Sequence, residues 1–410
     1  MIDYLIIGGG ITGITLARLL QQKNQNNFLV LEAGEQAGGL CRTEKIGNHY
    51  LDIGGGHFLC TKHQAVYDFI FSHIPESNFN FFPRVSKIEL EKEIIDYPVE
   101  SNLWQLSTEK KADYLISAIL AGEANDQSEP TNYLEWIRWK LGDRIAEFYM
   151  LPYNEKIWGV SPSEMDIDWL HKIPSVNTRE IVLSCLERSS DTDKFPSHAG
   201  FYYPKEGGFQ TIFDAIYQHV ADRVNLAEPV TSLEKIEGGW LVNNRYEAKM
   251  VINTAPWTKL YQALEVPEEL DDCFDKLRSN SIVVSLWEEE YDHDHHWCYI
   301  PDPEVRHHRE FYIHNFAPHS QSNGLYTETN YLRWEDKSGD HRFNSKPIYE
   351  HNNEIAYPIP TLGHAKAIES ILNHYQSKQL FGVGRWGQWQ YLNSDVCMWE
   401  AMKFVEGLLS

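Results

Sequence analysis

Three glycines between an apolar segment and a helical pattern restrict what the start of this chain can fold into. Gly8, Gly10 and Gly13 have the spacing G-x-G-x-x-G, after the apolar run 4–7. Apolar residues then recur at helical spacing over 14–20. At such a junction the glycines permit a tight turn, close approach of a pyrophosphate and packing of helix on strand. The pattern predicts a nucleotide-binding α/β unit in preference to a purely structural turn.

The residues after this unit indicate which dinucleotide it binds. A second apolar strand is predicted over 28–31, and Glu32 follows it, placed to accept hydrogen bonds from a ribose 2′-OH. A plain NAD domain would continue with strand and helix at this point, whereas this chain has Gly38, Gly39 and then Arg42. A second glycine pair there suits a longer cofactor, so the sequence favours FAD.

The C-terminal part of the chain is expected to complete the cofactor site. A strand, a glycine turn at Gly384 and Arg385, and a helical run over 396–409 follow one another. Such a turn can present backbone N–H groups and a helix dipole to the flavin ring. The segment 250–256 is predicted to be a buried strand that leads out of the same domain.

The predicted architecture is α/β, with a Rossmann-like FAD-binding domain, a helical insertion and an antiparallel β-sheet substrate domain. The discontinuous FAD-binding domain takes 1–83, 195–256 and 375–410. The mainly helical substrate domain takes 84–194, from the periodicity of 133–150, and the sheet domain takes 257–374.

Composition excludes several classes of partner. The formal net charge of −23 argues against nucleic acid and anionic membranes as partners. No apolar run approaches the ~20 residues of a membrane span, and the six cysteines have no paired spacing. We therefore expect a reduced, cytoplasmic protein that holds any anionic ligand with a local basic cluster.

Four longer segments add a family resemblance to this picture. They are 139–170 (WKLGDRIAEFYMLPYNEKIWGVSPSEMDIDWL), 202–216 (YYPKEGGFQTIFDAI), 356–364 (AYPIPTLGH) and 384–395 (GRWGQWQYLNSD). In this order they resemble UDP-galactopyranose mutase, a branch of the flavin amine oxidase and protoporphyrinogen oxidase superfamily. The resemblance covers nearly the whole chain.

This resemblance implies an unusual use of the flavin. In the family, reduced FAD attacks the anomeric carbon of the sugar through N5 and expels UDP, and the sugar recloses as the furanose. The net reaction is an isomerisation, used for polysaccharide biosynthesis. The implied partners are a nucleotide-sugar substrate and an external reductant such as NAD(P)H.

The resemblance also implies roles for single residues. His57 falls beside the flavin N5 edge, Asn393 lies near the flavin and sugar, and Val230 contacts the adenine end of FAD through its backbone. Arg309 pairs with the substrate diphosphate and is a catalytic candidate with His57. The candidate substrate-binding tyrosines are Tyr97, Tyr299, Tyr357 and Tyr391.

One departure from the family weakens the UDP interpretation. A second diphosphate arginine precedes the family's F-P segment, and Tyr202 stands in its place here. A buried diphosphate normally takes two charge-assisted donors. Lys205 is a possible substitute, although a lysine lacks the bidentate fork of an arginine.

Two other functions stay open at this point. An FAD oxidase or desaturase of the amine oxidase type would remove hydride from its substrate, and a catalytically inactive FAD protein would also explain Tyr202. The segment 288–299 carries three histidines, but their spacing gives no helical ligand pair, so no metal site is predicted.

Overall fold

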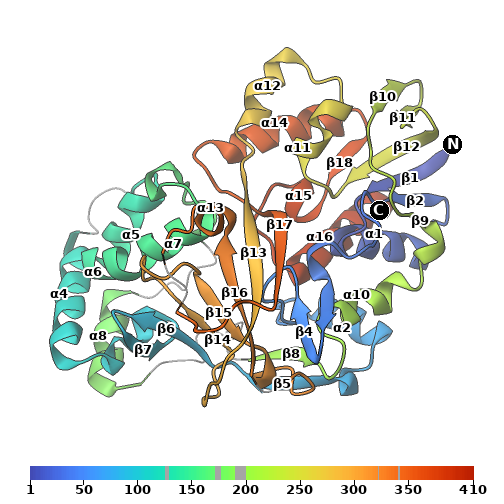
Figure 1. Ribbon diagram of the computed structural model, residues 1–410. Helices are drawn as coiled ribbons and strands as arrows, with labels where there is room; N and C mark the ends of the chain where they lie inside the picture. Colours follow the sequence, from blue (N-terminus) through green and yellow to red (C-terminus); the bar gives the residue numbers. More distant parts are fainter. Residues whose placement is uncertain (125–128, 171–176, 190–199, 322, 340–341) are drawn as a thin grey trace.

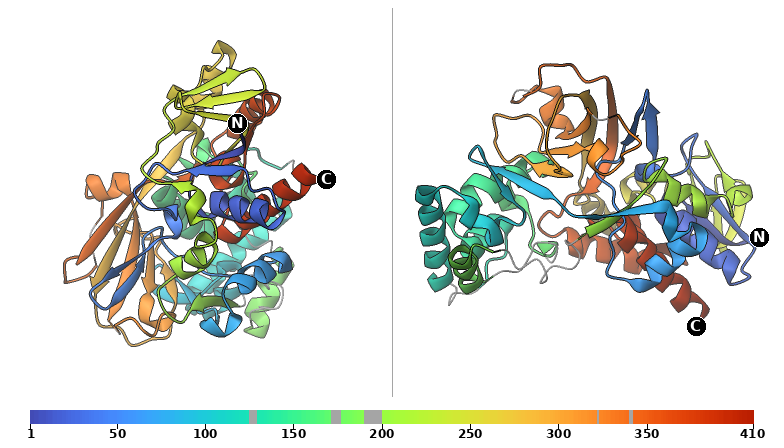
Figure 2. Two further views of the ribbon diagram at one scale, coloured as in Figure 1. Left: turned by 90° about the vertical axis from the view of Figure 1, so that its right-hand side faces the viewer. Right: turned by 90° about the horizontal axis from the view of Figure 1, so that it is seen from below.

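Two large sheets organise the part of the chain that the structure describes. The computed structural model describes residues 1–124, 129–170, 177–189, 200–321, 323–339 and 342–410. Figure 1 shows one sheet, with both chain termini, on the right and a group of helices on the left, with the second sheet between them. Figure 2 gives two further views of the same arrangement.

The first sheet has β1 in its interior, with parallel strands on both sides. β1 (Ile2–Ile7) pairs with β12 on one side and β2 on the other, and β18 extends the parallel part beyond β12. The other strands are β2 (Phe28–Leu31), β9 (Val224–Asn225), β10 (Leu233–Ile236), β11 (Gly239–Val242), β12 (Tyr246–Asn253) and β18 (Leu380–Gly382). This order is that of a Rossmann-like sheet with an added antiparallel edge formed by β10 and β11.

Helices cover both faces of the first sheet. Ile6 belongs to one buried cluster, while Leu5 and Ile7 belong to another, because successive side chains of a strand point to opposite faces. On the side of Ile6 lie α1 (Ile11–Gln22), α2 (Gln64–His73), α10 (Gln210–Tyr217) and α16 (Ser394–Leu409). On the other side lie α11 (Trp257–Leu260), α12 (Glu268–Asp275) and α14 (His364–Gln376).

The second sheet is antiparallel except for one pair of strands. Its order is β17 (Tyr349–Pro358), β13 (Ser279–Glu288), β16 (Gly324–Asn330), β15 (Arg309–Tyr312), β14 (Trp297–Tyr299), β6 (Ser86–Leu90) and β7 (Glu93–Asp96). Only β14 and β6 run parallel among these neighbours. Two small pairs accompany the large sheets: β3 (Thr43–Ile46) with β4 (His49–Asp52), and β5 (Phe79–Pro83) with β8 (Gly200–Pro204).

The helical group beside the second sheet is built mainly from the middle of the predicted insertion. It contains α3 (Val99–Asn102), α4 (Thr108–Ala124), α5 (Tyr133–Leu141), α6 (Asp143–Ile145), a π-helical turn η4 (Ala146–Met150), α7 (Leu151–Trp158) and α8 (Thr178–Glu187). Asn132 begins α5 by accepting a hydrogen bond from the N–H of Glu135, and Asn177 with Glu180 forms a capping box at α8.

The predicted fold class is confirmed, while the predicted domain division differs from the sheets in two places. The segment 84–194 was expected to be mainly helical, yet β6 and β7 within it join the second sheet through β14. The segment 257–374 supplies α11, α12 and α14, which cover the first sheet. A short strand or helix packs on the apolar surface that lies beside it in space. Domain bounds drawn along the sequence therefore do not capture where it belongs. The predicted bound at 194 and 195 lies outside the described residues.

Trp257 connects three segments of the first sheet's outer layer. Its Nε1 donates to the carbonyl oxygen of Gly387 at 2.7 Å, and its ring stacks on Tyr375 with centroids 5.6 Å apart. The side chain is fully buried. We expect Trp257→Phe to lower the free energy of unfolding by about 1 kcal/mol, and Trp257→Ala by about 3–5 kcal/mol. Urea unfolding followed by circular dichroism measures both, and equal stability of the two variants would contradict the expectation.

Candidate active site

In the glycine turn after β1, one glycine is tightly packed against the backbone and another borders open space. Gly8 has a φ of +101°, which favours glycine. A Cβ at Gly13 would lie 2.0 Å from the carbonyl oxygen of Gly8, so only glycine lets α1 pack here. A Cβ at Gly10 would meet nothing within 4 Å among the described residues outside its immediate chain neighbours. The turn therefore leaves space beside Gly10 at the start of α1.

The second glycine pair and the C-terminal glycine meet this turn. Gly38 forms an isolated β-bridge with Gly10, and a Cβ on Gly39 would lie 3.7 Å from the Cα of Gly10. Gly384 has a φ of +77°, and a Cβ there would lie 2.3 Å from the hydroxyl oxygen of Thr12. Glycines from both ends of the chain thus build one cradle.

Glu32 organises the same turn through the backbone. Its Oε2 accepts a hydrogen bond from Gly9 N–H at 2.6 Å, and its Oε1 accepts one from Gly34 N–H at 2.7 Å. Glu228 N–H donates to the Glu32 carbonyl at 2.8 Å, which brings the segment leading to Val230 alongside. Each carboxylate oxygen keeps a further lone pair. The ribose contact of Glu32 and the adenine contact of Val230 stay predictions.

Arg42 lies beside the glycine pair. A Cβ on Gly38 would lie 2.8 Å from the Arg42 Cγ, and the guanidinium Nη2 donates to Glu44 at 2.8 Å. The arginine thus packs its stem on the cradle and pairs its charge with a neighbour. Its predicted contact with the cofactor stays a prediction.

The cradle fits the pyrophosphate of FAD. Gly10 caps α1 without a side-chain hydrogen bond, and the first turn of the helix has no acidic residue. The first N–H groups and the positive end of the helix dipole are therefore available to an anion in the open space beside Gly10. When bound there, FAD would supply a redox-active ring, which the side chains alone lack.

Two glycine variants separate cofactor binding from folding. Gly10→Ala places a methyl group in the open space, so we expect normal stability of the cofactor-free protein and loss of most bound flavin. Gly13→Ala places its methyl group against Gly8, so we expect a lower melting temperature even without cofactor. Flavin absorbance after purification and thermal unfolding measure the two effects. Full flavin content in Gly10→Ala would contradict the assignment.

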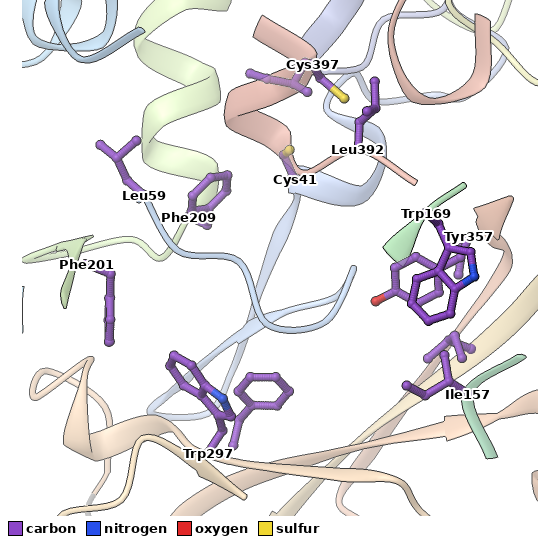
Figure 3. Close-up of a cluster of buried hydrophobic side chains, with 14 of the residues drawn as sticks. Cys41, Leu59, Ile157, Trp169, Phe201, Phe209, Trp297, Tyr357, Leu392 and Cys397 are labelled. Carbon is purple, nitrogen blue, oxygen red and sulfur yellow. The ribbon is translucent and has the colours of Figure 1, made fainter. Parts of the chain in front are cut away.

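A cavity of about 910 Å³ lies where the two sheets and the helical group meet. Eight of the predicted site residues line it: His57, Tyr97, Tyr299, Arg309, Tyr357, Arg385, Tyr391 and Asn393. Figure 3 shows buried aromatic side chains of its wall, with Phe201 and Trp297 in one part of the view and Trp169 and Tyr357 in another. The described residues that line this cavity do not include the glycine cradle or Val230.

Two arginines lie together in the cavity, and the sequence analysis identified only one of them. Arg309 has its guanidinium 5.7 Å from the ring centroid of Tyr299. Arg84 donates to the Tyr299 hydroxyl at 3.2 Å and lies 4.7 Å from the ring centroid of Tyr97. Arg84 follows β5 directly, and its only signal in the sequence is a basic residue after an aromatic strand, which is too common to identify a site.

Tyr202, which the resemblance puts in the place of a diphosphate arginine, is not among the described residues that line the cavity. The Tyr202 hydroxyl donates to Glu76 at 2.8 Å, and its ring packs against Phe81. Its neighbour Phe201 lines the cavity instead, because successive residues of β8 point to opposite sides. Lys205 is exposed and is not among the described residues that line the cavity.

Arg385 positions one wall of the cavity through backbone contacts. Its Nε donates to the Leu392 carbonyl at 2.7 Å, and Nη1 donates to the Ala356 carbonyl at 3.1 Å. The guanidinium also lies 5.4 Å from the Tyr357 ring and 5.9 Å from the Tyr391 ring. These contacts tie the C-terminal turn to β17.

Asn393 begins α16 as its N-cap without a side-chain hydrogen bond, and it is exposed. Its amide is therefore available to a ligand in the cavity, which it helps to line. The predicted contact with flavin and sugar stays a prediction.

His57 is a neutral imidazole with one nitrogen available. Its Nδ1 donates to the Gly55 carbonyl at 3.1 Å, which leaves Nε2 as an acceptor. Burial, reinforced by the nearby charge of Arg385, lowers the pKa of His57 to about 4. The structure therefore places an uncharged hydrogen-bond acceptor beside the cavity at neutral pH.

Two buried carboxylates complete the site. Glu328 lies 3.1 Å from the Arg309 guanidinium, and it accepts a hydrogen bond from Gly56 N–H. Glu100 lines the cavity near Tyr97, and its Oε1 has no hydrogen-bond partner among the described residues. Burial raises the pKa of Glu100 to about 7. Glu328 was not predicted from the sequence, because a glutamate in an otherwise buried strand gives no sign of its partner.

The histidine-rich loop before Tyr299 shows ring stacking. His293 stacks on His295 with ring centroids 4.0 Å apart. Within the described ranges, no three His, Cys, Asp or Glu side chains are grouped as metal ligands. Among the described residues, no helix is long and apolar enough to cross a bilayer.

Fold and cavity together define a class: a Rossmann-like nucleotide-binding protein with a second, mainly antiparallel sheet over its ligand cavity. A family model described as NAD(P)-binding Rossmann-like domain matches residues 6–71. dTDP-fucopyranose mutase of Escherichia coli is 21% identical over 418 residues, 99% of this chain and 98% of the relative. A crystal structure of reduced UDP-galactopyranose mutase matches with a TM-score of 0.89 at 20% identity, covering 100% of this chain and 94% of that one.

The wider superfamily also matches. Bovine flavin-containing amine oxidase A is 26% identical over 317 residues, which are 70% of this chain and 56% of the relative. The chain thus spans about half the length of this relative, whereas it matches the mutases almost from end to end. The resemblance to the UDP-galactopyranose mutase branch is confirmed.

The lowered pKa of His57 makes a prediction for acidic solutions. In the unfolded chain this histidine becomes protonated as the pH falls below its ordinary pKa of about 6.5. In the folded protein it becomes protonated only near pH 4. The free energy of unfolding should therefore fall as the pH drops from about 6.5 to about 4. NMR titration of the imidazole, assigned with His57→Asn, tests this directly, and protonation near pH 6.5 would contradict it.

Proposed function

We propose that the protein is an FAD-dependent mutase that interconverts the pyranose and furanose forms of a nucleotide sugar. The observation that carries this proposal is the pair of cavity arginines, Arg84 and Arg309, with Tyr299 between them. Two guanidiniums and a phenol suit a diphosphate, whereas the guanidiniums would repel a protonated amine substrate. The mutase relatives, which match over the whole chain, support the same conclusion.

The order of contacts around the cavity suits an elongated ligand. Arg385 contacts Tyr357 and Tyr391 on the side of the C-terminal turn. Arg309, Tyr299 and Arg84 follow, and Arg84 leads to Tyr97. We therefore propose that the sugar lies near His57, the diphosphate at the arginines and the base near Tyr97. Glu100 lies at this last position with an unsatisfied carboxyl oxygen.

When bound and reduced, FAD would supply a nucleophilic nitrogen, N5, that replaces the diphosphate at the anomeric carbon. The chain's own residues neutralise the leaving diphosphate, hold the sugar and exclude water from the cavity. The neutral Nε2 of His57 can accept a hydrogen bond from the sugar or the cofactor. The proposal includes an external reductant such as NAD(P)H, and, from the resemblance alone, cytoplasmic polysaccharide biosynthesis.

A second candidate is an oxidase or desaturase of the amine oxidase type. The match to bovine amine oxidase A favours it, because the alignment with that relative covers 70% of this chain. The arginines argue against it. Oxygen consumption with amine substrates separates the two candidates, since the mutase reaction consumes none.

The direct test is anaerobic incubation of the dithionite-reduced protein with UDP-galactofuranose or dTDP-fucofuranose, followed by chromatography of the nucleotide sugars. We expect the pyranose form to appear with the reduced protein only. Arg309→Gln should lower kcat/KM by about 10- to 100-fold, because it removes a charge-assisted contact with the diphosphate.

Arg306→Gln is the matched control. Arg306 lies in the loop just before β15, but its guanidinium donates to the Gly339 and Lys337 carbonyls. It is not among the described cavity-lining residues, so the variant should keep its kcat/KM. Absence of conversion with both substrates would exclude these two sugars, and amine-dependent oxygen consumption would support the oxidase instead.

A further inference from the structure

Glu328 contacts both halves of the proposed site. It lies in β16 directly opposite Arg309 of β15, so the two side chains leave the same face of the sheet. Oε2 lies 3.1 Å from Arg309 Nη2, and Oε1 accepts a hydrogen bond from Gly56 N–H at 2.9 Å. The Glu328 side chain is 0% exposed. One carboxylate thus contacts the anion-binding arginine and the loop that carries His57.

The loop before His57 is shaped around this carboxylate. A Cβ at Gly55 would lie 2.0 Å from Glu328 Oε1, and Gly55 has a φ of +89°. A Cβ at Gly56 would lie 2.1 Å from the ring of Phe311. Only glycines let the loop approach the sheet closely enough for the N–H of Gly56 to reach Glu328. His57 follows directly, so its position depends on this contact.

The same loop has a second, uncharged anchor. Asn353 of β17 donates from Nδ2 to the Ile53 carbonyl at 2.5 Å. This anchor precedes the glycines, and the Asn353 amide donates to the Ile53 and Ile282 carbonyls rather than to a group that contacts Arg309. The chain therefore offers a natural comparison between an anchor with a charge and one without.

Glu328 is ionised although it is buried. Burial alone would raise its pKa, but Arg309, His308 and the N–H of Gly56 outweigh that effect and lower the pKa of Glu328 to about 2. His308, whose Nε2 lies 3.4 Å from the carboxylate, has its own pKa lowered to about 4 by burial. At neutral pH the positive charge of Arg309 is thus already offset by Glu328 before an anion binds.

We propose that Glu328 is a positioning residue that fixes Arg309 and the His57 loop relative to each other and limits how tightly Arg309 holds a diphosphate. This inference rests on the proposed function. An arginine without a carboxylate partner in this cavity would attract a diphosphate more strongly and release it more slowly. Glu328 therefore acts through Arg309 and through Gly56, without touching the substrate.

A double-mutant cycle on the flavin-loaded protein tests the first part. Binding of UDP and of dTDP is measured by calorimetry for the wild type, Glu328→Gln, Arg309→Gln and the double variant. The amide in Glu328→Gln still accepts from Gly56 N–H but has no charge, so we expect binding tighter on the order of tenfold. In the Arg309→Gln background the same change should have no effect. Unchanged or weaker binding in Glu328→Gln, or equal tightening in both backgrounds, would overturn the inference.

Kinetics and two further variants test the second part. Glu328→Gln should lower KM and kcat together, because the nucleotide-sugar product leaves more slowly, whereas a purely structural role would lower kcat without lowering KM. Glu328→Asp keeps the charge but is too short to reach both partners. We expect it to keep nucleotide affinity within about threefold and to lose about tenfold in kcat. This variant keeps the inference testable even when Glu328→Gln does not fold, and a normal kcat in Glu328→Asp would overturn it.

Asn353→Ala is the matched control for the loop anchor. It removes an uncharged contact of the same loop, so nucleotide affinity should stay unchanged. Tightening in this variant would overturn the role of the Glu328 charge. If the wild type binds neither UDP nor dTDP, the proposed function fails and the inference fails with it. If the wild type binds both and Glu328 has no effect, only the inference fails.

Discussion

The parallel pairing of β1 with β12 is the constraint on which the rest of the molecule depends. It joins residues 2–7 to residues 248–253, and β18 then adds residues 380–382 to the same ladder. These strands are buried on both faces, so their pairing is favoured by apolar contacts from two layers of helices. The C-terminal part of the cofactor cradle follows from it, because Gly384 reaches Thr12 only when β18 lies beside β12.

The second sheet holds buried charged side chains, Arg309 and Glu328. The chain carries a net charge of −23, so a diphosphate would be repelled by the molecule as a whole. The cavity counters this with Arg84, Arg309 and Arg385, held by aromatic rings, backbone carbonyls and Glu328. A buried guanidinium without such partners would be costly, and a carboxylate partner makes it compatible with the folded state. The same carboxylate then influences how strongly the arginine attracts an anion.

The sequence predicted the first domain better than the second. The glycines, the strand before them and the helix after them are local features, and their spacing follows directly from turn and helix geometry. Arg309, Tyr299 and Tyr357 were identified only through the family resemblance. Arg84 and Glu328 were missed, and the direction in which Tyr202 points was not predicted, because each depends on which side of a short strand faces the cavity. A single shift of register reverses that choice.

The sequence by itself thus determined the class of fold, and it predicted a nucleotide cradle and a set of polar residues with the chemistry for a diphosphate. Backbone conformation near a glycine and the periodicity of apolar residues are local properties, because they depend on residues that are close together in the sequence. Only the tertiary structure decided which of the polar residues meet. Arg84 comes from the end of β5, Arg309 from β15 and Glu328 from β16. Their distances depend on strand pairing and on burial over the whole chain, so the cavity's electrostatics exist only in the folded protein.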